Sequence, residues 1–458
     1  MPSHFWRRLS LRVAISTVVY ATLVMGSLSV SACHGLLDVS DPTLIQDPDI
    51  ANAGGANGRR LDVVYAFSTK LLSTGLDVAM FTDEAIEDYS SAPARPGDNP
   101  WLNLDRRDDA LIMAQAAAND RDDHLAALDD IFSKSSVALA AMYAYGADSV
   151  KGDPYLSQLY AAKNEYLAQL YAMRSYVILQ MAEDICPGFP INDISADNQP
   201  VYSGPYSTDS ATAYALAQAD SALAQGRDST RFLNFAQVVK GRALLNLGRY
   251  AEAAAAVSTV PTTFTYTTDP SQGNSFIYLQ YLGGGVGERD GGNGLPFVSA
   301  SDPRVPTTFL RTRFTVPSDS VYNQQKYASG DPVIVTSGVE ARLIEAEAAI
   351  NAGDPNWLTI LNTLRESIGM ADLTDPGTTT AQVDLLYQER AFWLYMTGRR
   401  LGDLRRLIRN YGRGAETVFP TGAYPLGGLS YGSATAIPFT LSVQAKHNSK
   451  ITAGCTTR

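Results

Sequence analysis

The sequence is poor in the residues that most enzymes use to bind a metal or to activate a nucleophile. Its 458 residues include only three cysteines and four histidines, which are His4, His34, His124 and His447. None of them stands in an HExxH, CxxC or other metal-ligand spacing, and no GxSxG nucleophile motif occurs. The glycines between 283 and 294 do not form a phosphate-binding loop. We therefore expect a protein that is not an enzyme and that needs no metal or cofactor.

Basic charge is scarce as well. The formal net charge is -11, and removing residues 1–32, which hold three arginines and no acid, makes it (36-3)-47 = -14. A nucleic-acid-binding domain is expected to be basic, so nucleic acid is not an expected partner. With 45% hydrophobic and 18% charged residues, the chain has the composition of a folded globular protein.

The N-terminus has the layout of a secretory signal. HFWRRLSLR is basic, and the uncharged run from 13 to 32 ends in small residues just before Cys33. A single membrane span is the competing interpretation, because about 20 apolar residues can cross a bilayer, but the serines, threonines and small final residues favour cleavage. We predict a signal peptide over residues 1–32. Because LSVSAC resembles the bacterial lipobox, we also predict lipid attachment at Cys33; a soluble exported protein is the alternative.

The two remaining cysteines are candidates for a disulfide. An exported protein meets oxidising conditions, under which Cys186 and Cys455 can pair. Cys186 follows a predicted helix and Cys455 stands near the end of the chain, so a bridge would hold a tail that otherwise frays. We predict this bridge, with two unrelated buried thiols as the alternative.

Much of the chain predicts helix, with two loop-rich interruptions. Alanine- and leucine-rich runs near 51–86, 110–147 and 155–183 place apolar residues three and four apart. The first interruption, residues 88–108, contains three prolines, and the second, residues 261–336, is rich in Thr, Ser, Gly, Pro and aromatic residues. We expect short strands and long loops there, and long ordered loops are usually functional.

A repeat pattern defines the helical part more closely. KGRALLNLGRYAEAAAAV has small and aromatic residues at the offsets of a tetratricopeptide helix hairpin, namely Gly241, Gly248, Tyr250 and Ala253. EARLIEAEAAINAGDPNW repeats the seven-residue separation with Ala346 and Gly353. We therefore expect a mainly α fold of tetratricopeptide-type helical hairpins with a large irregular insertion.

The stretch QERAFWLYMTGRRLGDLRR, residues 388–406, combines an apolar helix with a basic cluster. Thr379 and Gln382 predict a capping box at the start of this helix, and Gly398 predicts its end. In a second short helix, Asp403 has three arginines at helical spacing, which are Arg399, Arg400 and Arg406. We interpret the cluster as a solvated group of ion pairs with a structural role, because an anion site would leave Asp403 unexplained.

This stretch resembles the C-terminal signature of the SusD/RagB family of outer-membrane nutrient-binding lipoproteins. Further fragments stand in the family's order, namely LLDVSDP, FTDEAIEDY, ASDPRVP, QKY and EARLIEAEAAINAG, so the resemblance covers nearly the whole mature chain, 33–458. Thr397 and the closing segment depart from the family pattern, which indicates a divergent member with one SusD-like domain over 33–458.

The resemblance implies a location and partners. Such proteins have a tetratricopeptide-like half that docks on a TonB-dependent outer-membrane transporter, and an irregular half that closes over the transporter as a lid and helps to capture glycans or peptides. We therefore expect an outer-membrane protein, anchored by lipid and facing the cell surface, with an oligosaccharide or peptide as its ligand.

Candidate ligand contacts follow partly from the resemblance and partly from chemistry. The resemblance places the loop after FTDEAIEDY on the ligand side, so Asp83 and Glu84 are carried over as pocket residues; a solvated acidic face is the alternative. Sugar rings stack on aromatic side chains. The loop aromatics that we select are Tyr89, Trp101, Tyr202, Tyr206, Tyr278 and Tyr281, with Trp101 first, although each could instead pack its own loop.

Three functions are therefore open at this point. The first is a non-catalytic, lipid-anchored ligand-capture subunit of a nutrient uptake complex. The second is a lipidated helical-repeat scaffold that binds only proteins. The third, a secreted glycan hydrolase, has little support because no motif places an acid and a base.

Overall fold

The structure is a computed structural model, and it describes residues 51–455 except for several internal segments. Those segments are 88–99, 120, 196–198, 227–228, 270–285, 288–294, 313–319, 329 and 425–427. Four predicted positions, Cys33, Tyr89, Tyr278 and Tyr281, and the predicted signal peptide lie outside the described residues. The chain divides into two units, Met1–Ala51 and Asn52–Arg458, and helix α3 and all later elements belong to the second.

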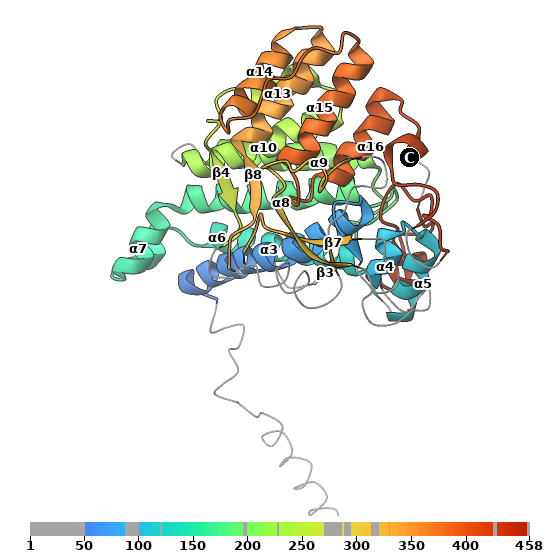
Figure 1. The fold of residues 1–458 in the computed structure, drawn as a ribbon. Coiled ribbons are helices and arrows are strands. Elements are labelled where there is room, and N and C mark those ends of the chain that lie inside the picture. Colours follow the sequence, from blue (N-terminus) through green and yellow to red (C-terminus); the bar gives the residue numbers. More distant parts are fainter. Residues whose placement is uncertain are drawn as a thin grey trace, which may run out of the picture. The chain divides into compact units, whose positions relative to one another are not determined.

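Helices build most of this unit, and successive helices pack against one another (Figure 1). The series begins with the contacts of α3 with α6, α6 with α8, and α8 with α9 and α10. It continues from α10 to α11 and α13, and from α13 to α14 and α15. The bounds are α3 Ala53–Phe81, α6 Asp123–Ala144, α8 Lys163–Asp184, α9 Thr208–Gln225, α10 Thr230–Asn246, α11 Tyr250–Val257, α13 Gly338–Ala352, α14 Asn356–Glu366 and α15 Thr379–Trp393.

Shorter helices complete the unit. After α15 the chain forms α16, Arg400–Tyr411, which contacts both α8 and α3. The others are α4 Pro100–Asp105, α5 Asp109–Asn119, the 3-10 helix η1 Ala147–Val150, α7 Pro154–Ala161, α17 Ala415–Val418 and α18 Leu441–His447. No helix in the described ranges is long and apolar enough to cross a membrane.

The predicted hairpin glycines are explained by close packing and by backbone conformation. A Cβ atom on Gly241 would lie 2.5 Å from Cγ1 of Val257, so glycine lets α10 approach α11 closely. Gly248 and Gly353 follow α10 and α13 with φ angles of 70° and 68°, the left-handed region that glycine adopts without a steric penalty. The predicted mainly α fold with helical hairpins is confirmed.

Within the residues that the structure describes, four antiparallel strand pairs interrupt the helices. They are β1 (Ile86–Glu87) with β5 (Val286–Gly287), β2 (Asp193–Ile194) with β3 (Pro200–Val201), β4 (Thr265–Thr267) with β8 (Ile334–Ser337), and β6 (Thr307–Thr312) with β7 (Ser320–Gln324). Thr265 pairs with Ser337, so β4 and β8 bring together the two ends of the predicted insertion at 261–336. The insertion therefore leaves and rejoins the helical body at one place.

Several predicted boundaries were wrong. Helix α3 ends at Phe81, shortly before Asp83, which has a φ of 63°. The prolines of 88–108 predicted loop throughout, but Pro100 begins α4, because proline fits the first turn of a helix. The predicted helix 110–147 consists of α5 and α6.

The predicted capping box was also wrong. Thr378, rather than Thr379, caps α15, and its Oγ1 accepts a hydrogen bond from the Ala381 N–H at 3.2 Å. The Gln382 side chain donates to Asp375 and makes no hydrogen bond with the N–H of the cap residue. The helix ends at Trp393, before the predicted end at Gly398.

The C-terminal segment is attached to the end of α8. Cys186 and Cys455 form a disulfide, with their Cα atoms 5.4 Å apart. The backbone N–H of Cys186 donates to the carbonyl of Ile437 at 3.0 Å, and that of Ile437 donates to the carbonyl of Asp184 at 2.8 Å. Covalent and hydrogen bonds therefore hold this segment on α8.

Candidate functional site

Three of the sequence fragments that carry the family resemblance, ASDPRVP, QKY and the 388–406 stretch, meet inside the protein. Arg304 of ASDPRVP pairs with Glu389 of QERAF, with Nη1 and Oε2 2.5 Å apart, and also with Asp302. Lys326 of QKY donates to the carbonyl of Tyr395 at 2.5 Å. ASDPRVP and QKY therefore each supply a charge whose partner stands in the 388–406 stretch, as a carboxylate or as a backbone carbonyl.

Asp403 is at the centre of this buried charge network. It accepts two hydrogen bonds from Arg390, each at 2.8 Å, and one from Arg406 at 2.9 Å. Arg406 also donates to both oxygens of Glu347, at 2.8 and 3.0 Å. Burial alone would raise the pKa of Asp403, but the charges of Arg390 and Arg406 outweigh it and hold that pKa below its ordinary value.

The predicted partners of Asp403 were only partly right. Arg406 pairs with it as the helical spacing indicated, whereas Arg399 lies 3.3 Å from Glu340 and donates to the Tyr176 hydroxyl at 2.9 Å. The prediction of a solvated cluster was also wrong, because Asp403 is only 3% exposed. The cluster instead joins α16 to α8, α13 and α15 from within.

Gly402 makes this arrangement possible. A Cβ atom at this position would lie 2.9 Å from Cδ of Glu183, so glycine allows α16 to approach α8. Glu183 in turn accepts a hydrogen bond from Asn246 at 2.7 Å and pairs with Arg242 at 3.1 Å. A glycine is therefore required at position 402, because the buried carboxylate of Glu183 packs against it.

Asp83 and Glu84 lie inside the fold rather than on an exposed acidic face. Each is 1% exposed, and the Tyr431 hydroxyl donates to Asp83 at 3.3 Å. Burial raises the pKa of Glu84 to about 8, against the opposing charges of Arg400 and Lys326. Asp83 and Glu84 were expected to contact a ligand, but side chains this deeply buried are not accessible to one.

Trp101 stands in a helix that is connected to Asp83 through side-chain contacts. It stands in α4 and not in the loop that was predicted for it. The next residue, Leu102, packs on Tyr424, whose ring centroid lies 5.1 Å from that of Tyr431. Because Tyr431 bonds Asp83, one set of contacts connects the helix that carries Trp101 with the end of α3.

Tyr202 and Tyr206 lie elsewhere, beside the β2–β3 pair. Tyr206 is half-buried and stacks on Tyr214 at a centroid distance of 6.2 Å, which favours the alternative that it packs its own loop. Tyr202 is 36% exposed, and its backbone carbonyl accepts a hydrogen bond from Lys450. The predicted ligand residues that the structure describes therefore fall into two groups.

A polar cavity of about 360 Å³ opens beside α4, which contributes Leu104 to its lining. Its size is within the range of small-ligand sites. Ligand hydroxyl groups could bond to side chains from α3, α5 and the start of α6, which include Lys70, Ser73, Asp77, Gln115, Asn119 and Asp123. We take this cavity as the candidate binding site, because the helix that carries Trp101 contributes to its lining.

His124 forms part of the lining of this cavity and joins two helices. Its Nδ1 lies 3.0 Å from Asp77 of α3 and its Nε2 lies 3.1 Å from Asp184 of α8. Burial alone would lower the pKa of His124, but its contacts with Asp184 and Asp77 outweigh it and raise that pKa to about 9. This triad could not be predicted from the sequence, because no sequence spacing connects its three members.

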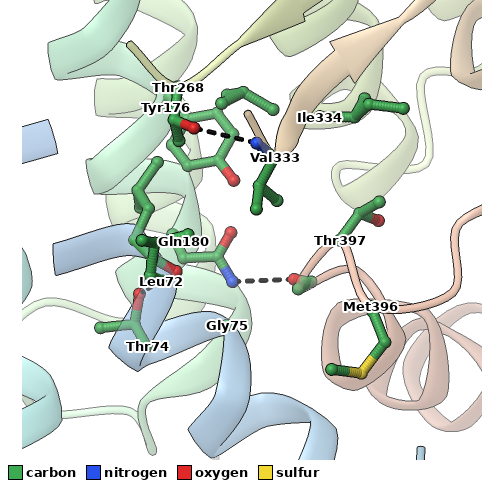
Figure 2. Close-up of a pocket in the computed structure, with 13 residues that line it drawn as sticks. Leu72, Thr74, Gly75, Tyr176, Gln180, Thr268, Val333, Ile334, Met396 and Thr397 are labelled. Carbon is green, nitrogen blue, oxygen red and sulfur yellow. Dashed lines mark hydrogen bonds between the residues drawn. The ribbon is translucent and has the colours of Figure 1, made fainter. Parts of the chain in front are cut away.

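A second cavity is too small for the expected ligand. Figure 2 shows it between α3, α8, β8 and the turn at 396–398, where Gln180 donates to the Gly398 carbonyl at 3.0 Å. Its volume of about 20 Å³ suits roughly one water molecule, not a sugar ring. It is therefore excluded as a glycan site.

A larger cavity of about 760 Å³ runs along the disulfide, between the start of α9, α16 and residues 433–438. The most deeply buried cation in its lining, Arg405, uses Nη1 to donate to three backbone carbonyls, those of Ala182, Glu183 and Ile185. Within the described part of the chain, no group of three or more His, Cys, Asp or Glu side chains is arranged to hold a metal ion.

These features define a helical-hairpin protein with a strand-and-loop insertion and a buried charge network. No family model and no curated protein sequence matches the chain. Its fold does match solved structures, including a SusD homolog from Bacteroides thetaiotaomicron, at 11% identity and a TM-score of 0.60 over 90% of this chain and 99% of that one.

Two further solved structures have names that state a ligand class. One is a putative sugar binding protein from Bacteroides vulgatus, at 14% identity and a TM-score of 0.58 over 89% of this chain and 98% of that one. The other is surface glycan-binding protein A from Bacteroides uniformis, at 12% identity and a TM-score of 0.57 over 87% and 99%. The chain has a SusD-like fold, as its motifs predicted, at a sequence identity that marks it as divergent.

Proposed function

We propose that the protein captures glycans without catalysis, as a subunit of an outer-membrane nutrient uptake complex. The observation that carries the proposal is a SusD-like fold over about nine-tenths of the chain, shared with proteins named for sugar or glycan binding. The polar cavity beside α4 supports it, because its amide, carboxylate and hydroxyl groups are the kind that bond sugar hydroxyls.

Trp101 is the proposed stacking residue of this site. Aromatic rings supply flat apolar faces for sugar rings, and the helix that carries Trp101 also contributes Leu104 to the cavity. Tyr202, exposed beside β3, is proposed as a more remote contact.

The first test is a glycan and peptide array with a soluble form of the chain that starts after Cys33. We expect glycan binding that Trp101→Ala reduces strongly while the melting temperature stays near that of the wild type. Tyr155→Ala is the matched control, because Tyr155 is 66% exposed on α7, which packs on η1 and α8 rather than on α4. Peptide binding alone would change the ligand class, and equal loss in both variants would refute the assignment to α4.

The anchor and the partner form the remaining part of the proposal. We propose that lipid on Cys33 holds the protein at the outer membrane, facing the cell surface, beside a TonB-dependent transporter. Cys33→Ala should release the protein from the membrane fraction, and a pull-down from detergent-solubilised membranes should recover the transporter. An array without any binding, together with recovery of a different protein assembly, would instead support a scaffold that binds only proteins.

A further inference from the structure

A cavity of about 410 Å³ lies between α15, α16 and α17, apart from the polar cavity beside α4. Its buried lining is mostly apolar, with Tyr387, Leu404, Leu407 and Val418 beside one charged residue. Toward solvent the lining becomes polar, and there Arg413 is already paired with Asp384 at 2.7 Å. The volume is within the range of small-molecule sites.

Arg400 also lines this cavity and differs from the arginines around it. It is 5% exposed, and it makes no hydrogen bond or ion pair with any residue that the structure describes; its Nε is enclosed without a partner. By contrast, Arg390, Arg399 and Arg406 each pair with a buried carboxylate. Burying a cation without a partner costs free energy, so an anion from a bound ligand would stabilise Arg400.

The nearby carboxylates are not available to Arg400. Both oxygens of Asp403 are occupied by Arg390 and Arg406. Glu84 makes no ion pair with Arg400, and burial raises its pKa, which disfavours the charged carboxylate that such a pair would need. The buried network thus lacks one negative charge on the side that faces the cavity.

We propose that this cavity binds an organic carboxylate with an apolar body. The carboxylate pairs with the guanidinium of Arg400, which can hold it through two parallel hydrogen bonds. The hydrocarbon part packs on Leu404, Leu407 and Val418. An inorganic anion would leave these apolar side chains uncovered, and a neutral apolar molecule would leave Arg400 without a partner. The site does not depend on the proposed glycan function.

The test is calorimetric titration of the full mature chain with two acids and their amides. Hexanoate represents a free short-chain acid, N-acetyl-leucine represents the C-terminal residue of a peptide, and hexanamide and N-acetyl-leucinamide are the uncharged controls. We expect at least one acid to bind and neither amide to do so. The acid that binds more tightly identifies the source of the carboxylate.

Arg400→Gln should weaken the binding of that acid by about tenfold or more, the effect of losing a charged hydrogen-bonding partner. Arg249→Gln, which removes an exposed arginine that pairs with Glu252 beside α11, should leave binding unchanged. If Arg400→Gln does not fold, Thr417→Trp, at an exposed lining position, should block access. No binding of either acid by the wild type, equal binding of the amides, or full binding by both Arg400→Gln and Thr417→Trp would overturn the proposal.

Discussion

Replacing Asp403 with asparagine should destabilise the protein strongly without removing any packing volume. The substitution leaves Arg390 and Arg406 close together at the centre of the network, without the carboxylate that now accepts three hydrogen bonds from them. Breaking a buried ion pair by removing one partner costs about 3–5 kcal/mol, because the remaining charge is left uncompensated. Glu347 still compensates Arg406, so we expect the lower half of this range.

This free energy converts into a measurable melting shift. An unfolding entropy of about 2.1 cal/mol/K per residue over roughly 400 residues gives about 0.8 kcal/mol/K, so the expected loss is roughly 4–5 °C. The matched control is Asp209→Asn, which removes the partner of another arginine of α16, Arg409, but whose side chain is 68% exposed. Exposed pairs contribute about 0–1 kcal/mol, so the control should shift the melting temperature by about 1 °C or less.

Differential scanning calorimetry of both variants at neutral pH decides the question, with glycan binding measured in parallel. Because the folded pKa of Asp403 is lowered, its contribution is present above the unfolded value, about 4, and is lost as pH falls through the folded pKa. The difference between wild type and Asp403→Asn should therefore shrink in acid. Equal shifts for Asp403→Asn and Asp209→Asn, or lost ligand affinity in a fully folded Asp403→Asn variant, would refute the reasoning.

Two further predictions concern stability. In the folded protein the pKa of His124 is raised to about 9, so its contribution to stability is fully present below the unfolded value, about 6.5, and is lost as pH rises through 9. Urea unfolding at pH 6 and pH 9 should therefore show a larger fall in the free energy of unfolding for the wild type than for His124→Gln. Equal falls in the two proteins would contradict this. Gly241→Ala should destabilise the protein by about 1–3 kcal/mol through its clash with Val257. The control Gly58→Ala, in open space within α3, should stabilise it by about 0.5–1 kcal/mol. Chemical denaturation compares the two variants, and an unchanged free energy of unfolding for Gly241→Ala would show that α10 and α11 can separate without cost.

The fold was predictable from sequence where the decisive contacts are local. Helical periodicity and the spacing of Gly241 and Gly248 depend on residues a few positions apart, and both led to the correct architecture. The Asp403–Arg406 pair was predictable for the same reason, since the two residues stand three apart in α16. The start of α4 was not, because proline is compatible with both a loop and a first helical turn.

The buried charge network was not predictable from one stretch of sequence. Arg399 pairs with Glu340 and Arg304 pairs with Glu389. These residues are so far apart in the sequence that no periodicity predicts the pairs. A charged residue in a sequence normally indicates a solvated face, and only a fold that brings these fragments together shows that they are interior. The ordered family fragments were the available signal, and they led to the correct fold without revealing which charges pair.

The disulfide has a consequence for how the protein responds to proteolysis. Cys186 and Cys455 are 269 positions apart and close a covalent ring that includes the whole insertion and helices α9 to α16. A single cut anywhere within that ring produces a new pair of chain ends but does not release a fragment. A nicked molecule would therefore migrate as one species on a non-reducing gel and separate into two only after reduction.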